Sequence, residues 1–167
     1  MRYTIISGTD RPGSNTKKVA NNYLRLLQGK GVDVQLLSLE TEAVFAKDGQ
    51  FTELAQTYLY PTDKYIIVMP EYNGSFPGVL KLLIDKSDVK AAWWNKKALL
   101  TGVATGRAGN LRGMEHLTGS LLHMKILVHP NRLPISMVDK ILDAEGNIID
   151  EGTLKAIGQQ LDEFIGF

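Results

Sequence analysis

The predicted secondary-structure elements alternate between strand and helix along the whole chain, and this alternation predicts a doubly wound α/β domain. Short apolar runs rich in β-branched residues alternate with segments of helical periodicity. Three of the predicted strands run directly into loops rich in Gly, Asn, Ser and Thr, at residues 8–16, 70–78 and 105–113. In a parallel sheet covered by helices on both faces, such loops meet beyond the carboxyl ends of the strands, where ligands bind.

The first unit consists of a strand, a glycine-containing loop, a helix and a second strand. Residues 3–7 form a short apolar run that ends at a turn. Residues 15–27 then place apolar side chains at helical spacing, and Gly29 and Gly31 mark the end of that helix. Residues 32–39 are extended and apolar, as expected for a buried parallel strand.

The middle of the chain begins with its least patterned stretch. Residues 40–60 form a long connection in which we expect one short helix at about 53–58. Residues 65–69 are apolar and β-branched, which predicts another buried strand. After it, Pro77 suits the first turn of a helix, and residues 79–84 carry apolar side chains at helical spacing.

The last part of the chain repeats the alternation. Residues 98–104 predict a fourth strand, followed by a glycine-rich turn and a helix that runs to about Met124. A fifth strand is predicted at 126–128. The stretch "ILDAEGNIID" (141–150) indicates a small hairpin or loop before a final helix at about 152–164.

Length and composition limit the class of protein. The 167 residues fit one domain, 1–167, and 19 Lys plus Arg against 18 Asp plus Glu give a formal charge of +1. Without a dense basic run, we expect no nucleic-acid partner. No apolar stretch approaches the roughly 20 residues that span a bilayer, and no targeting segment is recognisable, so we expect no membrane partner and a cytoplasmic location. The absence of Cys excludes disulfides and thiolate metal sites.

Several residue types that often carry function lack the required spacing. His116, His123 and His129 do not form a compact metal-binding motif, and "DAEGN" has too little of the twelve-residue calcium-loop pattern. We therefore expect no metal ion. Trp93 and Trp94 are expected to be packed or at a subunit interface.

The stretch "GTDRPGSNT" at 8–16 spaces two glycines as a nucleotide-phosphate loop does, G-x-x-x-x-G. A triphosphate loop continues with Lys and then Ser or Thr, but Ser14 and Asn15 stand there, and the dinucleotide pattern G-x-G-x-x-G is also absent. Because the loop leads into a helix N-terminus and carries hydroxyl groups and Arg11, it suits a phosphate monoester. The alternative is a tight turn in which Ser14 or Asn15 only caps the helix.

The stretch "PEYNGSFPGVLKLLID", which begins at Pro70, follows the third predicted strand. Tyr72, Asn73, Gly74 and Ser75 combine an aromatic ring, an amide and a closely approaching backbone, which together can line a flat heterocycle. The alternative is an ordinary turn bounded by Pro and Gly before a helix.

Together with "TGRAGNLRGMEHL" after the fourth strand, these two stretches resemble the NADPH-dependent FMN reductase family, which includes quinone, azo-dye and chromate reductases. The resemblance covers nearly the whole chain, and its second motif is the most specific. It implies a flavodoxin-like fold, with a five-stranded parallel sheet in the order 2-1-3-4-5 and helices on both faces.

The resemblance also implies an FMN site made of three loops. The first would bind the FMN phosphate through Thr9, Arg11, Ser14, Asn15 and Thr16. The second would flank the isoalloxazine through Pro70, Glu71, Tyr72, Asn73 and Gly74. The third would approach the pyrimidine side through Thr105, Gly106, Arg107 and Gly109.

The function implied by the resemblance is that of an FMN-dependent NAD(P)H oxidoreductase. Hydride would pass from NADPH or NADH to FMN, and then by a ping-pong mechanism to a quinone, flavin, azo compound or similar small-molecule acceptor. FMN carries this chemistry, so no catalytic side chain is assigned. A homodimer or homotetramer is implied. The alternatives are a flavodoxin-like electron carrier and a non-enzymatic FMN-binding module.

Overall fold

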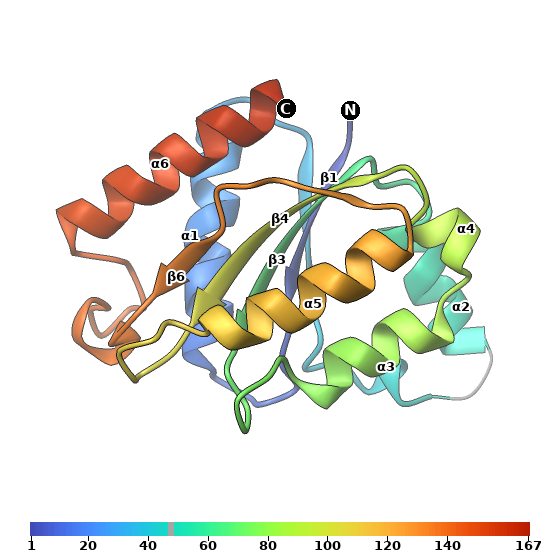
Figure 1. Cartoon of the computed structure of the whole chain (residues 1–167), viewed down its shortest axis with the longest axis horizontal. Coiled ribbons are helices and arrows are strands. Elements are labelled where there is room, and N and C mark those ends of the chain that lie inside the picture. Colours follow the sequence, from blue (N-terminus) through green and yellow to red (C-terminus); the bar gives the residue numbers. More distant parts are fainter. Residues whose placement is uncertain (47–48) are drawn as a thin grey trace.

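The computed structural model describes residues 1–46 and 49–167, and it is built on a parallel sheet with helices on both faces (Figure 1). The strands are β1 (Tyr3–Ser7), β2 (Val34–Ser38), β3 (Lys64–Pro70), β4 (Lys97–Val103), β5 (Leu127–Val128) and β6 (Leu133–Ile135). Their order is β2-β1-β3-β4-β5, and β6 also pairs with β4. The predicted doubly wound α/β class and the order 2-1-3-4-5 are therefore confirmed.

The helices are α1 (Asn15–Gly29), η1 (Glu42–Val44), α2 (Gly49–Leu54), the π-helical η2 (Ala55–Leu59), α3 (Gly78–Lys86), α4 (Val89–Ala92), α5 (Leu111–His123), η3 (Val138–Lys140) and α6 (Glu151–Gly166). The four long helices, α1, α3, α5 and α6, lie where the apolar periodicity predicts them, and η1, α4 and η3 are short helices that the sequence did not predict. The short helix expected at 53–58 is found as the α2 and η2 pair. Positions 47 and 48 of the same connection lie outside the described residues.

The two faces of the sheet each bury one hydrophobic cluster. Helices α1 and α6 cover one face, and α3 and α5, with α2 and α4 beside them, cover the other (Figure 1). Successive strand residues point to opposite faces. Ile5, paired with Ile66, therefore packs under α1 and α6, while the next pair, Ile6 and Ile67, packs under α3 and α5. Burying each such side chain contributes about 1.5–3 kcal/mol.

The fifth strand differs from the prediction. A strand at 126–128 was expected, but the edge next to β4 is formed by two short segments. β5 pairs with the start of β4, and β6 pairs with its end. Between them, the chain leaves the sheet at Pro130, which has no N–H to donate to a ladder. The side-chain amide of Gln160 on α6 bridges this gap, because its Nε2 donates to the carbonyl oxygens of Leu100 (3.2 Å) and Asn131 (2.8 Å).

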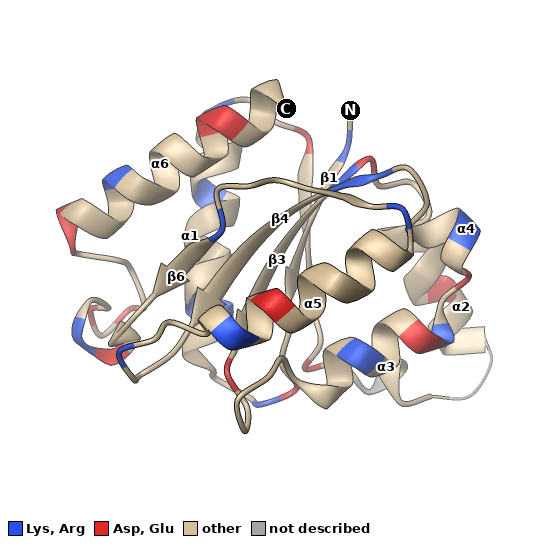
Figure 2. Cartoon of the chain, viewed as in Figure 1, with Lys and Arg blue, Asp and Glu red and all other residues tan. Residues whose placement is uncertain are grey.

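Charged side chains lie mainly on the outer faces of the helices and in the connections, while most of the sheet is uncharged (Figure 2). The segment at 141–150 forms a small turn closed by an antiparallel bridge between Leu142 and Ile148, consistent with the expected hairpin or loop. Within residues 1–46 and 49–167, no helix combines the length and apolar character needed to cross a bilayer.

Candidate functional site

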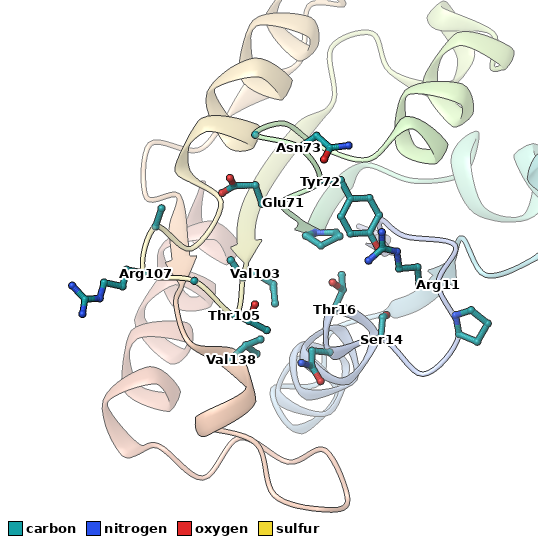
Figure 3. A pocket seen from close by; sticks show the side chains of 17 residues that line it. Arg11, Ser14, Thr16, Glu71, Tyr72, Asn73, Val103, Thr105, Arg107 and Val138 are labelled. Atoms are coloured by element: carbon teal, nitrogen blue, oxygen red, sulfur yellow. The ribbon is translucent and has the colours of Figure 1, made fainter.

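The loops that follow β1, β3 and β4 surround a cavity of about 730 Å³ at the carboxyl edge of the sheet (Figure 3). Residues of all three loops line it, together with Val138. The lining residues that sequence reasoning selected are Arg11, Ser14, Asn15, Thr16, Pro70, Glu71, Tyr72, Asn73, Gly74, Thr105, Gly106 and Arg107. The structure therefore brings together residues that are up to about a hundred positions apart, as the parallel arrangement requires.

The first loop ends at the N-terminus of α1. Ser14 is the N-cap residue, and its Oγ accepts a hydrogen bond from the backbone N–H of Lys17 (3.1 Å). Capping therefore does occur, yet it uses only a lone pair of the hydroxyl group, whose proton stays available to a ligand. Asn15 and Thr16 follow on the first turn, where backbone N–H groups have no intrahelical acceptor. The loop can thus cap its helix and present donors to an anion at once.

Thr9 is the first of two selected residues that do not line the cavity. It is fully buried, and its Oγ1 shares a hydrogen bond with the Tyr72 hydroxyl (2.5 Å) while accepting one from the Arg11 backbone N–H (3.3 Å). Tyr72 is in turn covered by Arg11, whose guanidinium carbon lies 4.0 Å from the ring centroid. Thr9 and Arg11 therefore join the first loop to the second. Figure 3 shows Arg11 lying over the ring of Tyr72.

The second loop forms a tight turn over Tyr72–Ser75. The backbone N–H and carbonyl groups of Tyr72 and Ser75 bond each other in both directions, at 2.9 and 3.1 Å. Asn73 (φ 51°) and Gly74 (φ 77°) both have positive φ, which a type I′ turn requires and which Asn-Gly supplies at low cost. From α5, His116 reaches the same turn, with its Nδ1 2.9 Å from Ser75 Oγ.

The third loop is held in place by the segment after β6. The Val138 and Met137 N–H groups donate to the carbonyl oxygens of Ala104 and Gly106, at 3.1 Å each, and Ser136 Oγ donates to the Arg107 carbonyl (2.6 Å). The side chain of Arg107 extends away from the cavity (Figure 3). Gly109 is the second selected residue outside the lining, because it packs against Pro134: a Cβ on Gly109 would lie 2.7 Å from the Cβ of Pro134.

Sequence reasoning missed five lining residues: Pro12, Val103, Ala104, Ala108 and Val138. Pro12, Ala104 and Ala108 directly adjoin selected residues and Val103 is two positions from Thr105, so the continuity of the loops was a signal that could have found these four. Val138 had no such signal, since it reaches the cavity only through the pairing of β6 with β4.

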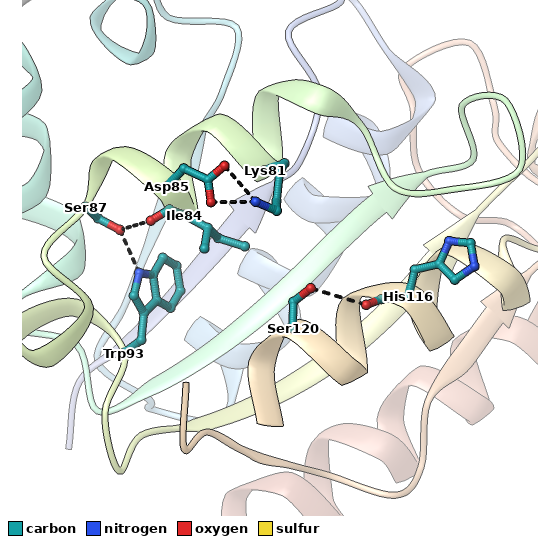
Figure 4. Close-up of polar contacts among 7 residues, drawn as sticks. All are labelled: Lys81, Ile84, Asp85, Ser87, Trp93, His116 and Ser120. Carbon is teal, nitrogen blue, oxygen red and sulfur yellow. Dashed lines mark hydrogen bonds and ion pairs between the residues drawn. The ribbon is translucent and has the colours of Figure 1, made fainter. Parts of the chain in front are cut away.

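A second hollow, of about 450 Å³, lies between α3 and α5, with Lys81, Asp85, His116, Ser120 and His123 among its lining residues. Lys81 donates to both carboxylate oxygens of Asp85 at 2.6 Å, so this pair is satisfied within α3 (Figure 4). In the part of the chain that the structure describes, no three His, Cys, Asp or Glu side chains gather in a way that could hold a metal ion.

The two tryptophans occupy different environments. Trp93 is fully buried, and its Nε1 donates to Ser87 Oγ (2.6 Å; Figure 4). The centroid of its ring lies 4.8 Å from that of the Tyr65 ring. The prediction that it is packed is confirmed. Trp94 is half-buried, with the ammonium groups of Lys90 and Lys125 over its ring at 5.2 and 4.1 Å.

Comparison with known proteins gives one family match and several relatives. The model of the NADPH-dependent FMN reductase family matches residues 1–140. The chain is 27% identical to a 2-hydroxy-1,4-benzoquinone reductase from Burkholderia sp., over 98% of this chain and 94% of that protein. It is 28% identical to an NAD(P)H-dependent FMN reductase from Pseudomonas aeruginosa, over 93% and 89%.

Solved structures show the same fold at lower sequence identity. The flavoenzyme NAD(P)H:(acceptor) oxidoreductase FerB from Paracoccus denitrificans superposes with a TM-score of 0.78 at 22% identity, covering 99% of this chain and 95% of that one. A flavodoxin from the domain Archaea gives a TM-score of 0.63 at 17% identity, with full coverage of both chains. The flavodoxin-like arrangement of the sheet is therefore shared with proteins of known structure.

Proposed function

The chain belongs to the NADPH-dependent FMN reductase family, and on that premise we propose that it uses NAD(P)H to reduce a small quinone-type acceptor at the cavity formed by its three loops. It is an FMN-dependent oxidoreductase, as the family match and the relatives of similar length indicate. The observation that carries the proposal is the convergence of all three loops of the family motif on one cavity.

The residues of the cavity fit FMN. Its volume of about 730 Å³ lies within the range of about 300–1,000 Å³ that is usual for small-molecule and cofactor sites. A phosphate monoester suits the free N–H groups at the start of α1, the hydroxyl groups of Ser14 and Thr16, and the guanidinium group of Arg11. None of these contacts needs a metal ion.

We propose specific positions for the parts of the cofactor. Arg11, Ser14, Asn15 and Thr16 would hold the phosphate. The segment from Pro70 to Gly74 would flank the isoalloxazine, and the segment from Thr105 to Arg107 would approach its pyrimidine side. Thr9 and Gly109, which lie behind the cavity wall, would support these loops through Tyr72 and Pro134.

When bound, FMN supplies the redox chemistry, accepting hydride from NAD(P)H and passing it to the acceptor. The chain binds and orients the reactants and contributes no acid–base pair. We further propose a ping-pong order, because one cavity has to admit the nicotinamide and the acceptor in turn. We also propose that the protein is a homodimer or homotetramer and that it acts in the cytoplasm, where NAD(P)H is supplied.

Steady-state kinetics tests this function. Without oxygen and with a catalytic amount of FMN, sustained NADPH oxidation should require a quinone such as benzoquinone, and double-reciprocal plots at several quinone concentrations should be parallel. A control without FMN should show little oxidation. Intersecting lines would contradict the ping-pong order and indicate a ternary complex of enzyme, NADPH and quinone. If the bound flavin stays oxidised when excess NADPH or NADH is added in the absence of oxygen, the protein would instead be an electron carrier.

A further inference from the structure

The buried amide of Asn110 joins two walls of the cavity. Asn110 ends the third loop and is the N-cap residue of α5, with a left-handed backbone conformation (φ 66°) and a fully buried side chain. Its Oδ1 accepts a hydrogen bond from the Gly113 N–H (3.1 Å), and its Nδ2 donates to the carbonyl oxygens of Met69 (3.1 Å) and Pro70 (2.8 Å). One side chain thus caps a helix and also holds the start of the second loop.

The surrounding backbone is shaped to admit this side chain. A Cβ on Gly102 would lie 3.0 Å from the Asn110 Cβ and 2.2 Å from the Gly109 carbonyl oxygen. A Cβ on Gly113 would lie 2.1 Å from Asn110 Oδ1, closer than real Cβ atoms approach. Neither contact could be relieved without moving backbone or the amide itself. Glycine at both positions therefore leaves the space in which the Asn110 amide reaches β3.

The two hydrogen bonds of Nδ2 exceed what a cap requires. Capping α5 needs only an oxygen acceptor on the side chain, which Asp and Ser also carry. The amide nitrogen instead satisfies two carbonyl groups at the end of β3, directly before Glu71 and Tyr72, which line the cavity. A buried polar group that is fully satisfied fixes its neighbours in one arrangement.

We propose that Asn110 is a positioning residue for the flavin ring: through Met69 and Pro70 it fixes the second loop relative to the third. This inference rests on the proposed function, because it takes the segment from Pro70 to Gly74 as the isoalloxazine wall. Asn110 itself does not line the cavity and acts through the backbone that it holds. Loss of the two hydrogen bonds of Nδ2 should weaken binding at the ring site and leave binding at the phosphate site of α1 unchanged.

The test separates the helix-capping bond of Asn110 Oδ1 from the two hydrogen bonds that its Nδ2 donates to β3. Asn110→Asp and Asn110→Ser both keep an oxygen for the Gly113 N–H, but neither reproduces the two hydrogen bonds of Nδ2. The Ser variant removes these two bonds without adding a charge. Asn110→Gly tolerates the left-handed backbone and loses both functions. The matched control is Asp150→Gly, which removes the N-cap bond of α6 to the Thr153 N–H (2.7 Å), away from the cavity.

FMN and riboflavin dissociation constants are measured by fluorescence titration, beside thermal unfolding. Two neutral hydrogen bonds correspond to a roughly tenfold change in affinity. For Asn110→Asp and Asn110→Ser we expect both flavins to bind about tenfold more weakly, with the ratio of the two constants unchanged. Hydrogen exchange should rise at residues 69–75 in the protein without flavin. Asp150→Gly should lower the unfolding temperature and leave both constants unchanged.

The possible failures are distinguishable. If the wild-type protein binds neither flavin saturably, the proposed function fails and the inference falls with it. If the wild type binds FMN while Asn110→Asp and Asn110→Ser bind both flavins like the wild type, only the inference is overturned and Asn110 is a helix cap. A loss confined to FMN would also overturn it, because the effect would then lie at the phosphate.

Discussion

Arg11 is held over the ring of Tyr72, with its guanidinium carbon 4.0 Å from the ring centroid. A cation–π contact of this kind contributes about 0.5–1 kcal/mol where the pair is exposed to solvent. Among the described residues, none of the ion pairs involves Arg11. Its charge and its donors therefore remain available for a phosphate, and the contact with Tyr72 links the proposed phosphate site to the proposed ring site.

At the residue scale, we predict that Arg11→Ala weakens FMN binding by about tenfold to a hundredfold, since a hydrogen bond to a charged group contributes about 1.5–3 kcal/mol. The loss should shrink at high salt, which screens the guanidinium charge in the wild type. Riboflavin, which has no phosphate, should lose far less. Calorimetry with both flavins, at two salt concentrations and with EDTA present, measures these effects.

The comparison variant is Ser14→Ala. It removes a neutral hydroxyl from the same loop, so its effect on FMN should be smaller and nearly independent of salt. It should also lower the stability of the fold by about 1 kcal/mol through loss of the N-cap of α1. Equal affinities of the wild type for FMN and riboflavin would mean that the loop only caps the helix.

At the scale of elements, the divided fifth strand depends on Gln160 of α6. Its Oε1 accepts a hydrogen bond from the Tyr23 hydroxyl of α1 (2.6 Å), while its Nε2 spans the gap between β5 and β6. Burial raises the pKa of Tyr23, so its phenol stays protonated and remains a donor. This network connects two helices to the edge of the sheet, and β6 in turn leads to Val138 in the cavity wall.

We predict that Gln160→Leu lowers the free energy of unfolding by about 2–4 kcal/mol, because the carbonyl groups of Leu100 and Asn131 lose their buried donor. Gln159→Leu is a matched control: the substitution is the same and the position adjacent, but the side chain is exposed and donates to Glu163 Oε1 on its own helix. It should change stability by less than about 0.5 kcal/mol. Urea unfolding measures both variants, and equal losses would show that the network at Gln160 contributes little.

At the scale of the whole molecule, the two hydrophobic clusters lie on opposite faces of one sheet, and we propose that residues 1–167 form one domain. Trp93 is fully buried, so it offers nothing to a subunit contact. The half-buried residues Phe76 and Trp94 remain as apolar candidates near the surface. An open cavity edge beside Phe76 would gain from a second subunit, whereas Trp94 directly precedes the amino end of β4, at the opposite edge of the sheet from the cavity.

We therefore predict a dimer or tetramer of the 18.5 kDa chain. Light scattering over a range of protein concentrations should give two or four times the mass of the chain, and adding FMN should not dissociate the assembly. A strict monomer at high concentration would mean that the cavity edge stays uncovered, which would contradict this part of the proposal.

The sequence by itself determined the alternation of strands and helices, because the periodicity of apolar residues and the punctuation by Gly and Pro are local signals. It also located the three loops, since every loop after a parallel strand reaches the same edge of the sheet. The turn at Asn73 and Gly74 is local in the same sense: both residues adopt positive φ, as the Asn-Gly pair favours.

Only the tertiary structure decided the features that depend on residues distant in the sequence. Thr9 faces Tyr72, 63 positions away, and so lies behind the cavity wall. Val138 enters the cavity because β6 pairs with β4, and the Asn110 amide reaches the carbonyl groups of β3 across 40 and 41 positions. Such contacts leave no periodic or local signal, because a hydrogen bond between distant residues depends on where the whole sheet brings their backbones together.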